Sequence, residues 1–314
     1  MDGILALWKE RGMTSHDCVF KLRKILHMKK IGHGGTLDPE VDGVLPICLG
    51  KGTKVIEFLQ DNGKVYEGEI SLGYATATED RYGEVIAETP LTRPFTIAEI
   101  DGAMADFVGE ITQVPPMYSA VKVKGRKLYE YARAGESVER PKRQVSIATF
   151  QRTSEPIWNQ QEQTQSWRFR VVCGKGTYVR TLAVDTGASL GVAACMTDLT
   201  RLASGGFTKE QAVTLAQVAE AFETGKMTEI LLPVEAALKD FSSVTIDERT
   251  WQRVRNGSRM SYQGLGLSQL PLQPVAVYYQ GQVVSLYQAN SKEKDGMKPL
   301  KVLRTELEPK NGNY

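Results

Sequence analysis

The strongest structural signal in this chain is the alternation of apolar and charged side chains at Lys64–Tyr74. Tyr66, Ile70 and Leu72 fall on one face of an extended segment, and two glutamates fall on the other. A period of two residues is typical of a β-strand with one face buried. We therefore expect Tyr66 to point toward the core or into a cleft beside it.

Other segments carry strand and helix patterns of their own. Short apolar runs predict strands at Ile4–Trp8, Val145–Phe150 and Trp167–Cys173. Apolar residues at three- and four-residue steps predict helices at about 14–27, Ile97–Phe107 and Tyr178–Leu190, with one or two helical turns at Thr53–Leu59. The polar, glutamine-rich segment Glu155–Ser166 is expected to be a mobile loop.

The length of the chain and a change of texture near Phe241 predict two domains. A chain of 314 residues can form a sizeable core and more than one domain. Beyond Phe241 the pattern is that of a hairpin, Val275–Tyr279 with Gln282–Tyr287, followed by a strand at Lys301–Leu303. We expect a main domain over residues 1–240 and a small β-rich domain over residues 241–314.

A glycine-rich loop presents a single carboxylate. Residues 32–39 read GHGGTLDP, and residues 42–46 read DGVLP. Glycines let a backbone approach a ligand closely, and the following proline favours an extended Asp38. Catalytic side chains are common on ordered loops, but Asp, Gly and Pro are also ordinary turn residues. Chemistry alone leaves a catalytic Asp38 and a simple turn equally open.

Basic residues gather in one part of an otherwise nearly neutral chain. The formal net charge is +2, so contact with nucleic acid must rest on a local patch. The segment Met117–Arg143 holds eight Lys or Arg against three Glu, an excess of +5. Tyr118, Tyr129 and Tyr131 are interspersed among these cations, a mixture that suits phosphate neutralisation and base stacking. The alternative is a solvated charged surface.

Several familiar sites do not fit the spacing. A calcium loop starting at Asp38 would need Glu at its twelfth position, which is Leu49, and no phosphate-loop motif is complete. Three dispersed histidines and four cysteines without a C-x-x-C pair predict no metal site and reduced thiols. Asp38 and Asp42 lack the spacing of a glycosidase pair. With no signal-peptide pattern or membrane-length apolar run, we expect a soluble, cytoplasmic protein.

Five segments, in order, resemble the TruB family of pseudouridine synthases. The resemblance covers most of the chain from Gly3 to about Phe207. Its motifs are GILALWK (3–9) with GMTS (12–15), residues 32–46, YEG (66–68) with LG (72–73), PPMYSAVK (115–122) with GRKLYEYAR (125–133), and GKGTYVRTL (174–182) continuing to LTRL (199–202). One departure is Glu10, where the family commonly has a proline after the lysine.

The resemblance implies an α+β pseudouridine synthase fold, with a central mixed, mostly antiparallel sheet, helices, RNA-binding insertions and a cleft between two halves. Residues 1–240 would form the catalytic domain with a basic thumb-like insertion at about 113–143. Residues 241–314 would form a PUA-like RNA-binding domain, matched here by position and texture.

The implied reaction is isomerisation of uridine 55 in the T-loop of tRNA. The N-glycosidic bond breaks, the base rotates, and the base is rejoined through C5 without a cofactor or a metal. The expected partner is the T arm of tRNA, with no nucleotide cofactor and no membrane, and the expected state is a monomer. Two other functions stay open: a non-catalytic tRNA-binding or folding module, and a glycoside or nucleoside hydrolase using the same carboxylate.

The resemblance also implies roles for individual residues. Asp38 is the catalytic aspartate, Arg180 pairs with it, and Tyr66 stacks on the target base and helps to move the C5 proton. A carboxylate can act as a nucleophile or as a base, and the order of these steps stays open. The residues expected to contact substrate are His33, Tyr178, Leu199, Lys9, Lys122, Lys124, Arg126 and Lys127.

Overall fold

The computed structural model describes residues 1–307, and its largest element is a ten-stranded sheet. The strands of this sheet are β1 (Gly3–Lys9), β2 (Ile31–His33), β3 (Asp42–Leu49), β4 (Lys64–Leu72), β7 (Gly109–Gln113), β10 (Arg143–Arg152), β11 (Ile157–Asn159), β12 (Thr164–Cys173), β13 (Ala194–Ser204) and β14 (Phe207–Thr208). Their main order in space is β1-β3-β13-β4-β12-β10-β7. All pairs are antiparallel except β3 with β13, which confirms a mixed, mostly antiparallel sheet.

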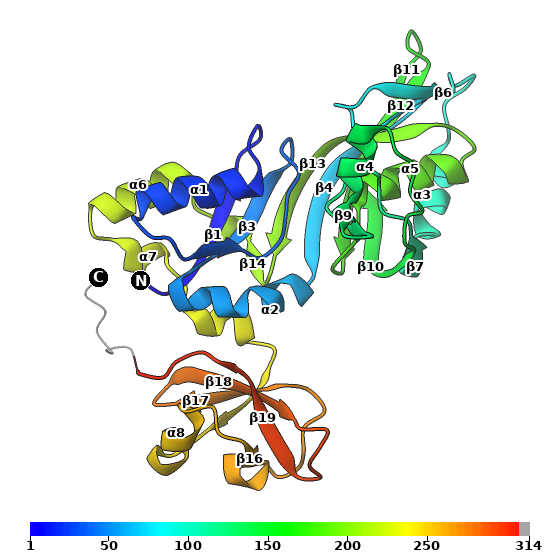
Figure 1. The fold of residues 1–314 in the computed structure, drawn as a ribbon. Coiled ribbons are helices and arrows are strands. Elements are labelled where there is room, and N and C mark those ends of the chain that lie inside the picture. Colours follow the sequence, from blue (N-terminus) through cyan, green and yellow to red (C-terminus); the bar gives the residue numbers. More distant parts are fainter. Residues whose placement is uncertain (308–314) are drawn as a thin grey trace.

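The two central strands, β4 and β13, join two halves of this sheet (Figure 1). One half holds β1, β2 and β3, and the other holds β12, β10 and β7. The alternation predicted for β4 is confirmed, because Tyr66, Ile70 and Leu72 are all buried. A side chain on β4 therefore lies where residues from both halves can meet it.

Helices cover the sheet on both halves. They are α1 (Ser15–Ile25), α2 (Ile56–Asp61), α3 (Ile97–Ala105), α4 (Leu128–Ala134), α5 (Val179–Ser189), α6 (Leu215–Glu223), α7 (Met227–Ile230) and α8 (Glu248–Val254). Short 3₁₀ turns lie at Gly50–Val55, Lys209–Gln211, Val234–Leu238 and Gln263–Leu265. Thr14 caps α1 through a reciprocal hydrogen-bond pair with Asp17. The predicted helices are confirmed, and the ends of α1, α3 and α5 lie within two residues of expectation. The helical turns expected at Thr53–Leu59 are the end of a 3₁₀ turn followed by α2.

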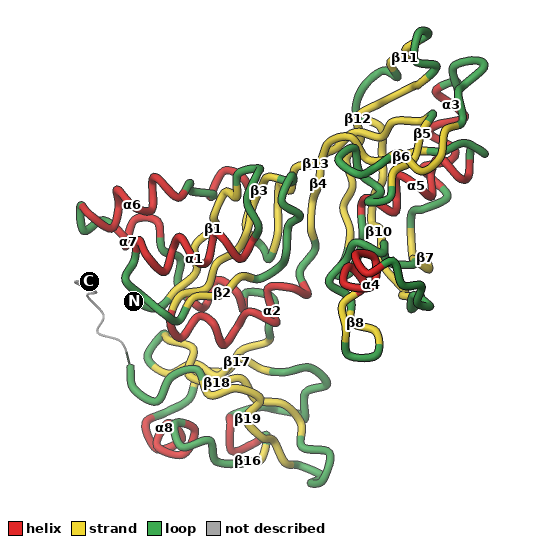
Figure 2. Tube along the Cα trace, turned by 45° about the horizontal axis from the view of Figure 1, so that its top comes forward, coloured by secondary structure: helices red, strands yellow, loops and turns green. Residues whose placement is uncertain are grey.

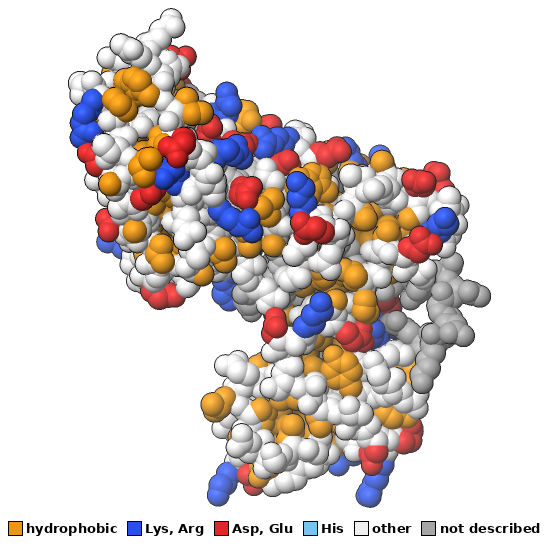
Figure 3. All heavy atoms as spheres, turned by 180° about the vertical axis from the view of Figure 1, so that it is seen from behind, with side chains coloured by type: hydrophobic (Ala, Val, Ile, Leu, Met, Phe, Trp, Pro, Cys, Tyr) orange, Lys and Arg blue, Asp and Glu red, His pale blue; other side chains and the backbone are white. Residues whose placement is uncertain are grey.

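A second sheet forms a lobe beneath the first half (Figure 1). Its strands are β15 (Ser242–Thr245), β16 (Met260–Ser261), β17 (Val275–Tyr279), β18 (Gln282–Ala289) and β19 (Gly296–Val302). The expected β17–β18 hairpin is confirmed, with Gln280 and Gly281 at positive φ in its turn. Figure 3 shows this lobe as a separate body from behind. Buried apolar side chains from both bodies, including Ile4, Val44 and Leu286, form one shared cluster.

The expectation of a mobile loop at Glu155–Ser166 is wrong. Ile157–Asn159 forms β11 and pairs with Thr164–Ser166 at the start of β12. Backbone pairing across a tight turn therefore orders a segment whose side chains are polar and largely exposed. Strands β3 and β13 were not predicted, because most of their residues are buried on both faces and give no alternation.

The basic segment is an insertion between two neighbouring strands. The chain leaves the sheet at Gln113 in β7 and returns at Arg143 in β10, and these two residues are register partners. Between them lie the hairpin of β8 (Lys122–Val123) and β9 (Arg126–Lys127) and then α4. Figure 2 shows this hairpin projecting away from the sheet. A further small sheet pairs β5 (Tyr74–Thr76) with β6 (Val85–Glu88).

Candidate active site

The loop between β2 and β3 carries Asp38 and is pinned on both sides of it. Before Asp38, the Ser15 hydroxyl accepts from the Leu37 amide at 2.8 Å. After it, the Pro39 carbonyl accepts from Lys9 Nζ at 3.0 Å and from the Gly12 amide at 3.0 Å. The Asp38 side chain itself stays 44% exposed. The loop is thus ordered while its carboxylate remains accessible.

Arg180 pairs with this carboxylate across the cleft between the two halves. Its Nε lies 3.0 Å from Asp38 Oδ2, although the two residues are far apart in the sequence. The guanidinium is only 6% exposed and also donates to the Thr78 carbonyl at 2.6 Å and the Tyr118 carbonyl at 3.0 Å. These two carbonyls fix the plane of the guanidinium, so Arg180 can hold Asp38 in a single orientation.

The start of α5 is held in place as well. The Gln113 side-chain amide bonds Tyr178 in both directions, donating to its carbonyl at 3.0 Å and accepting from its amide at 2.8 Å. Tyr178 is the N-cap residue of α5, two positions before Arg180. The expected substrate contact of Tyr178 concerns its partly buried ring, whereas its backbone secures the helix that carries the arginine.

A turn at residues 77–83, which no sequence pattern predicted, completes this wall of the site. Its Asp80 carboxylate lies 4.0 Å from Arg180 Nη1, and Glu79 adopts φ +65°, a conformation unusual for a residue other than glycine. The turn is tied to β13 because the Met196 amide donates to the Glu79 carbonyl at 3.1 Å. No local periodicity or motif marks such a turn.

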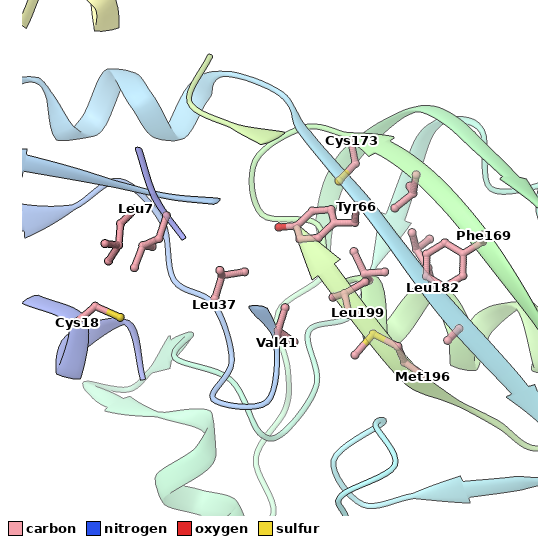
Figure 4. Packing of buried hydrophobic residues seen from close by; sticks show 14 of the residues in the cluster. Leu7, Cys18, Leu37, Val41, Tyr66, Phe169, Cys173, Leu182, Met196 and Leu199 are labelled. Carbon is pink, nitrogen blue, oxygen red and sulfur yellow. The ribbon is translucent and has the colours of Figure 1, made fainter. Parts of the chain in front are cut away.

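Tyr66 lies beneath the Asp38 loop, with Arg201 beside it. The two residues are register partners in β4 and β13, and both are buried, at 7% and 1% exposure. Burial raises the pKa of the Tyr66 hydroxyl, and the nearby Arg201 guanidinium opposes this shift. Figure 4 shows the Tyr66 hydroxyl pointing away from Cys173 and toward the side where Leu37 and Val41 lie.

Arg201 also holds the backbone of the Asp38 loop. Its guanidinium donates to the carbonyls of Val44 at 2.9 Å, Thr36 at 3.2 Å and Gly35 at 3.3 Å. The family motif LTRL (199–202) contains Arg201, but only the tertiary structure brings its side chain under the Asp38 loop. Arg201 was therefore absent from the expected site residues.

A cavity of about 250 Å³ opens between the Asp38 loop, the 77–83 turn and β13. Asp38 and Leu199 both line it, together with Met196 and Tyr82. Leu199 is 7% exposed and contributes an apolar wall. A cavity that combines an accessible carboxylate with apolar walls can receive a nucleobase and its ribose.

Arg11 lines the same cavity and was likewise not among the expected site residues. Its guanidinium pairs with Asp198 at 2.7 Å and with Asp42 at 3.1 Å. Asp198 pairs in turn with Arg168 at 3.1 Å. Arg11 and Asp198 line the cavity, and the two cations and two carboxylates of this network balance one another.

Lys9 is placed differently from expectation. It is 0% exposed, and its Nζ donates to three backbone carbonyls, of Glu10 at 2.9 Å, Met13 at 2.8 Å and Pro39 at 3.0 Å. Burial lowers its pKa. A lysine enclosed in this way braces the Asp38 loop from below and is not available for contact with RNA. The brace is formed although Glu10 stands where the family commonly has proline.

His33 ends β2 beside the glycine-rich loop and is partly buried. Burial is the main cause that lowers its pKa below the ordinary value of 6.5, and the positive charge of Arg201 adds to this effect. The imidazole is therefore neutral near pH 7, a state suited to packing or stacking against a base.

The four basic residues expected to contact RNA fall into two groups. Lys122 and Lys124 are exposed on the β8–β9 hairpin. Arg126 pairs with Glu136 at 2.8 Å and lies over the Tyr131 ring, while Lys127 lies near the Tyr129 ring. The first pair is thus open to a partner, and the second pair stabilises the insertion.

The described residues were compared with the features of a metal site and of a membrane-spanning helix. Across residues 1–307, no three His, Cys, Asp or Glu side chains gather as a metal site would require. All four cysteines are buried and free. No helix in this range is long and apolar enough to cross a bilayer.

Comparison with known proteins shows the family of this chain. The model of the TruB family pseudouridylate synthase N-terminal domain matches residues 23–179, and that of the tRNA pseudouridylate synthase B C-terminal domain matches residues 180–239. The chain belongs to the TruB family of pseudouridine synthases. Tyr66, Arg180 and Asp38 come together in the part of the chain that these two family models cover.

Relatives in the TruB family match nearly the whole chain. The tRNA pseudouridine synthase B of Latilactobacillus sakei is 50% identical over 294 residues, covering 93% of this chain and 95% of the relative. The proteins of the same name from Levilactobacillus brevis and Streptococcus pyogenes are both 51% identical and cover 96% of this chain and 99% of their own length.

Solved structures extend the likeness to the fold. The chain resembles a structure described as a Cbf5–Nop10–Gar1 complex, with a TM-score of 0.73, 28% identity and coverage of 96% of this chain and 85% of that chain. A second match, described as an H/ACA RNP bound to a substrate RNA containing 2'-deoxyuridine, has a TM-score of 0.70 and 26% identity and covers 96% and 85% of the two chains. The expected pseudouridine synthase fold is thereby confirmed.

Proposed function

We propose that this protein converts uridine 55 in the T-loop of tRNA to pseudouridine, with Asp38 as the catalytic residue. The observation that carries the proposal is the ion pair of Arg180 with an accessible Asp38 carboxylate that lines a cavity of about 250 Å³. The names of the TruB relatives support tRNA as the substrate.

In this proposal the uridine leaves the stacked loop and enters the cavity. Tyr66 stacks on the uracil, Leu199 packs against it, and Asp38 stands beside C1′ of the ribose. The cost of unstacking, a few kcal/mol, is offset by base stacking and by contacts to phosphates. Arg180 orients the Asp38 carboxylate, and the neutral His33 packs near the flipped nucleotide.

The thumb-like insertion and the C-terminal domain would bind the T arm. Lys122 and Lys124 on the thumb-like insertion neutralise phosphates, while Arg126 and Lys127 shape the hairpin that presents them. We propose that residues 1–240 form the catalytic domain and that residues 241–314 form a PUA-like RNA-binding domain, of which residues 308–314 lie outside the described structure. We further propose that the protein acts as a monomer in the cytoplasm.

The test is tritium release or mass-spectrometric detection of pseudouridine in an unmodified tRNA transcript. The wild-type protein should modify position 55, and Asp38→Asn should abolish product while tRNA binding stays within about threefold, because the exchange keeps the side-chain volume. Asp240→Asn, on the chain before β15, is a matched control and should keep wild-type turnover. Equal turnover by Asp38→Asn would contradict the assignment.

The same assay separates the alternatives. A non-catalytic tRNA-binding module would bind the transcript without product in any variant, and the presence of both Asp38 and Arg180 disfavours this outcome. A hydrolase would release free uracil, which chromatography of the reaction would detect. An isomerase leaves the mass of the tRNA unchanged and releases no base.

A further inference from the structure

Tyr82 is the exposed aromatic side chain of the active-site cavity. It lines the cavity together with Asp38 and Leu199, yet 57% of it is open to solvent. The other large apolar residues with strongly exposed side chains in residues 1–307 do not line this cavity: Phe20, Val85, Ile86, Ile97, Val108, Ile157 and Leu272. Tyr82 therefore stands at the mouth, with one part of its ring toward the cavity and another toward solvent.

The backbone beneath Tyr82 is rigid. The Asp80 carboxylate accepts from the Tyr82 amide at 3.0 Å and from the Thr78 hydroxyl at 2.7 Å. On the other side, the Arg81 amide donates to the Met196 carbonyl at 3.0 Å and ties the turn to β13. Gly83 closes the turn tightly, since a Cβ there would lie 2.3 Å from the Thr78 hydroxyl. An exposed ring on a fixed backbone loses little conformational freedom when it binds a ligand.

The connectivity of RNA indicates what reaches the mouth of the cavity. A cavity of about 250 Å³ has room for a small ligand of the size of a nucleoside. A flipped nucleotide stays joined to its neighbours through its two phosphates, so one neighbour must leave the cavity past the mouth. Unpaired bases of RNA are recognised chiefly by stacking on aromatic rings.

We propose that Tyr82 stacks on the base of a nucleotide adjacent to the target uridine and so holds the opened RNA loop at the cavity. This inference rests on the proposed function, since it requires a uridine in the cavity. Tyr82 is a substrate-positioning residue here, distinct from Tyr66, which lies buried under the Asp38 loop. The phenol oxygen is not needed for stacking, so a phenyl ring should serve as well.

The test combines variants of Tyr82 with RNA that lacks a single base. Tyr82→Ala and Tyr82→Phe are compared on a tRNA transcript and on two transcripts with an abasic ribose directly 5′ or 3′ of the target. Equilibrium binding and single-turnover rate are both measured. Phe20→Ala is the matched control, because Phe20 is a comparably exposed aromatic, at 53%, that does not line the cavity.

Tyr82→Ala should weaken binding of the intact transcript about tenfold, while Tyr82→Phe and Phe20→Ala stay within about twofold of wild type. Removal of the base that stacks on Tyr82 should weaken RNA binding by the wild-type protein by a similar factor but should not change RNA binding by Tyr82→Ala. The abasic transcript that gives this result identifies the stacked nucleotide. Unaltered binding by Tyr82→Ala, or losses that add for both neighbours, would overturn the proposal. Because binding is measured apart from turnover, absence of pseudouridine in the wild-type reaction would count against the proposed function alone.

Discussion

Arg201 and Tyr66 are register partners in β13 and β4, and the buried Arg201 guanidinium lies close enough to the Tyr66 hydroxyl to oppose the rise in its pKa that burial causes. The same guanidinium donates to the Gly35 and Thr36 carbonyls of the loop that carries Asp38. Within residues 1–307 no carboxylate forms an ion pair with Arg201. One buried cation thus lies between the expected base-stacking residue and the loop that carries Asp38.

Arg201→Lys should therefore impair both stability and catalysis. Lysine cannot reproduce the fork that bonds several carbonyls at once, and buried carbonyls without donors cost free energy. We expect the free energy of unfolding to fall by about 2 kcal/mol and the single-turnover rate to fall more than the affinity for tRNA. Arg304→Lys, at a buried arginine just after β19, should reduce stability while leaving the rate per folded molecule unchanged. Equal rates for the two variants would argue against a link between Arg201 and the site.

The stability of the protein should depend on pH through His33. Burial lowers the pKa of His33 in the folded state below 6.5, so the unfolded chain binds a proton more readily than the folded one. Stability therefore rises with pH through the window just below about 6.5 and is lost as the pH falls through it. Urea unfolding of the wild type and of His33→Asn at pH values from about 5 to 7.5 measures this slope. The variant should show a flatter dependence, whereas His27→Asn, at an exposed histidine, should behave as the wild type.

Gly43 should tolerate no larger residue. Its φ is +127°, and a Cβ there would lie 2.2 Å from the Arg201 carbonyl oxygen. Gly43→Ala should lower the free energy of unfolding by about 3 kcal/mol, from backbone strain and steric overlap. Gly102, inside α3, meets nothing within 4 Å, so Gly102→Ala should raise stability by about 0.5–1 kcal/mol. Chemical denaturation of the two variants compares them, and similar effects at both positions would refute the steric argument.

Lys122 and Lys124 should contribute affinity that depends on salt. Each exposed lysine that neutralises a phosphate adds about one to the slope of log K against log salt concentration. The double variant Lys122→Ala/Lys124→Ala should therefore bind tRNA more weakly at low salt and show a slope smaller by about two. Thermal unfolding should be unchanged, since both side chains are exposed. Lys226→Ala, near α7, is the control. An unaltered slope in the double variant would show that the RNA does not contact Lys122 and Lys124.

Local patterns were sufficient for much of the fold. Alternation located β4, three- and four-residue steps located α1, α3 and α5, and an apolar hairpin located β17 and β18. These features depend on residues close in the sequence, whose spacing records which face is buried. The same logic failed for β3 and β13, because strands buried on both faces show no period, and for β11, whose pairing depends on its partner strand.

For the site, resemblance to a family indicated the pairing of Asp38 with Arg180, and the structure places Arg180 Nε 3.0 Å from Asp38 Oδ2. It indicated nothing about Arg11, Asp80 or Arg201, which approach from three different strands and loops. Lys9 was expected at the substrate, and only the packed structure reveals it as a buried brace.

The amino-acid sequence alone thus sufficed for the local elements, the glycine-rich loop and the family. Which neighbours each side chain contacts was decided only by the tertiary structure. The reason is physical: a helix or strand period is a property of a few consecutive residues, whereas a bond from Arg201 to Gly35 exists only after distant strands have paired and excluded water.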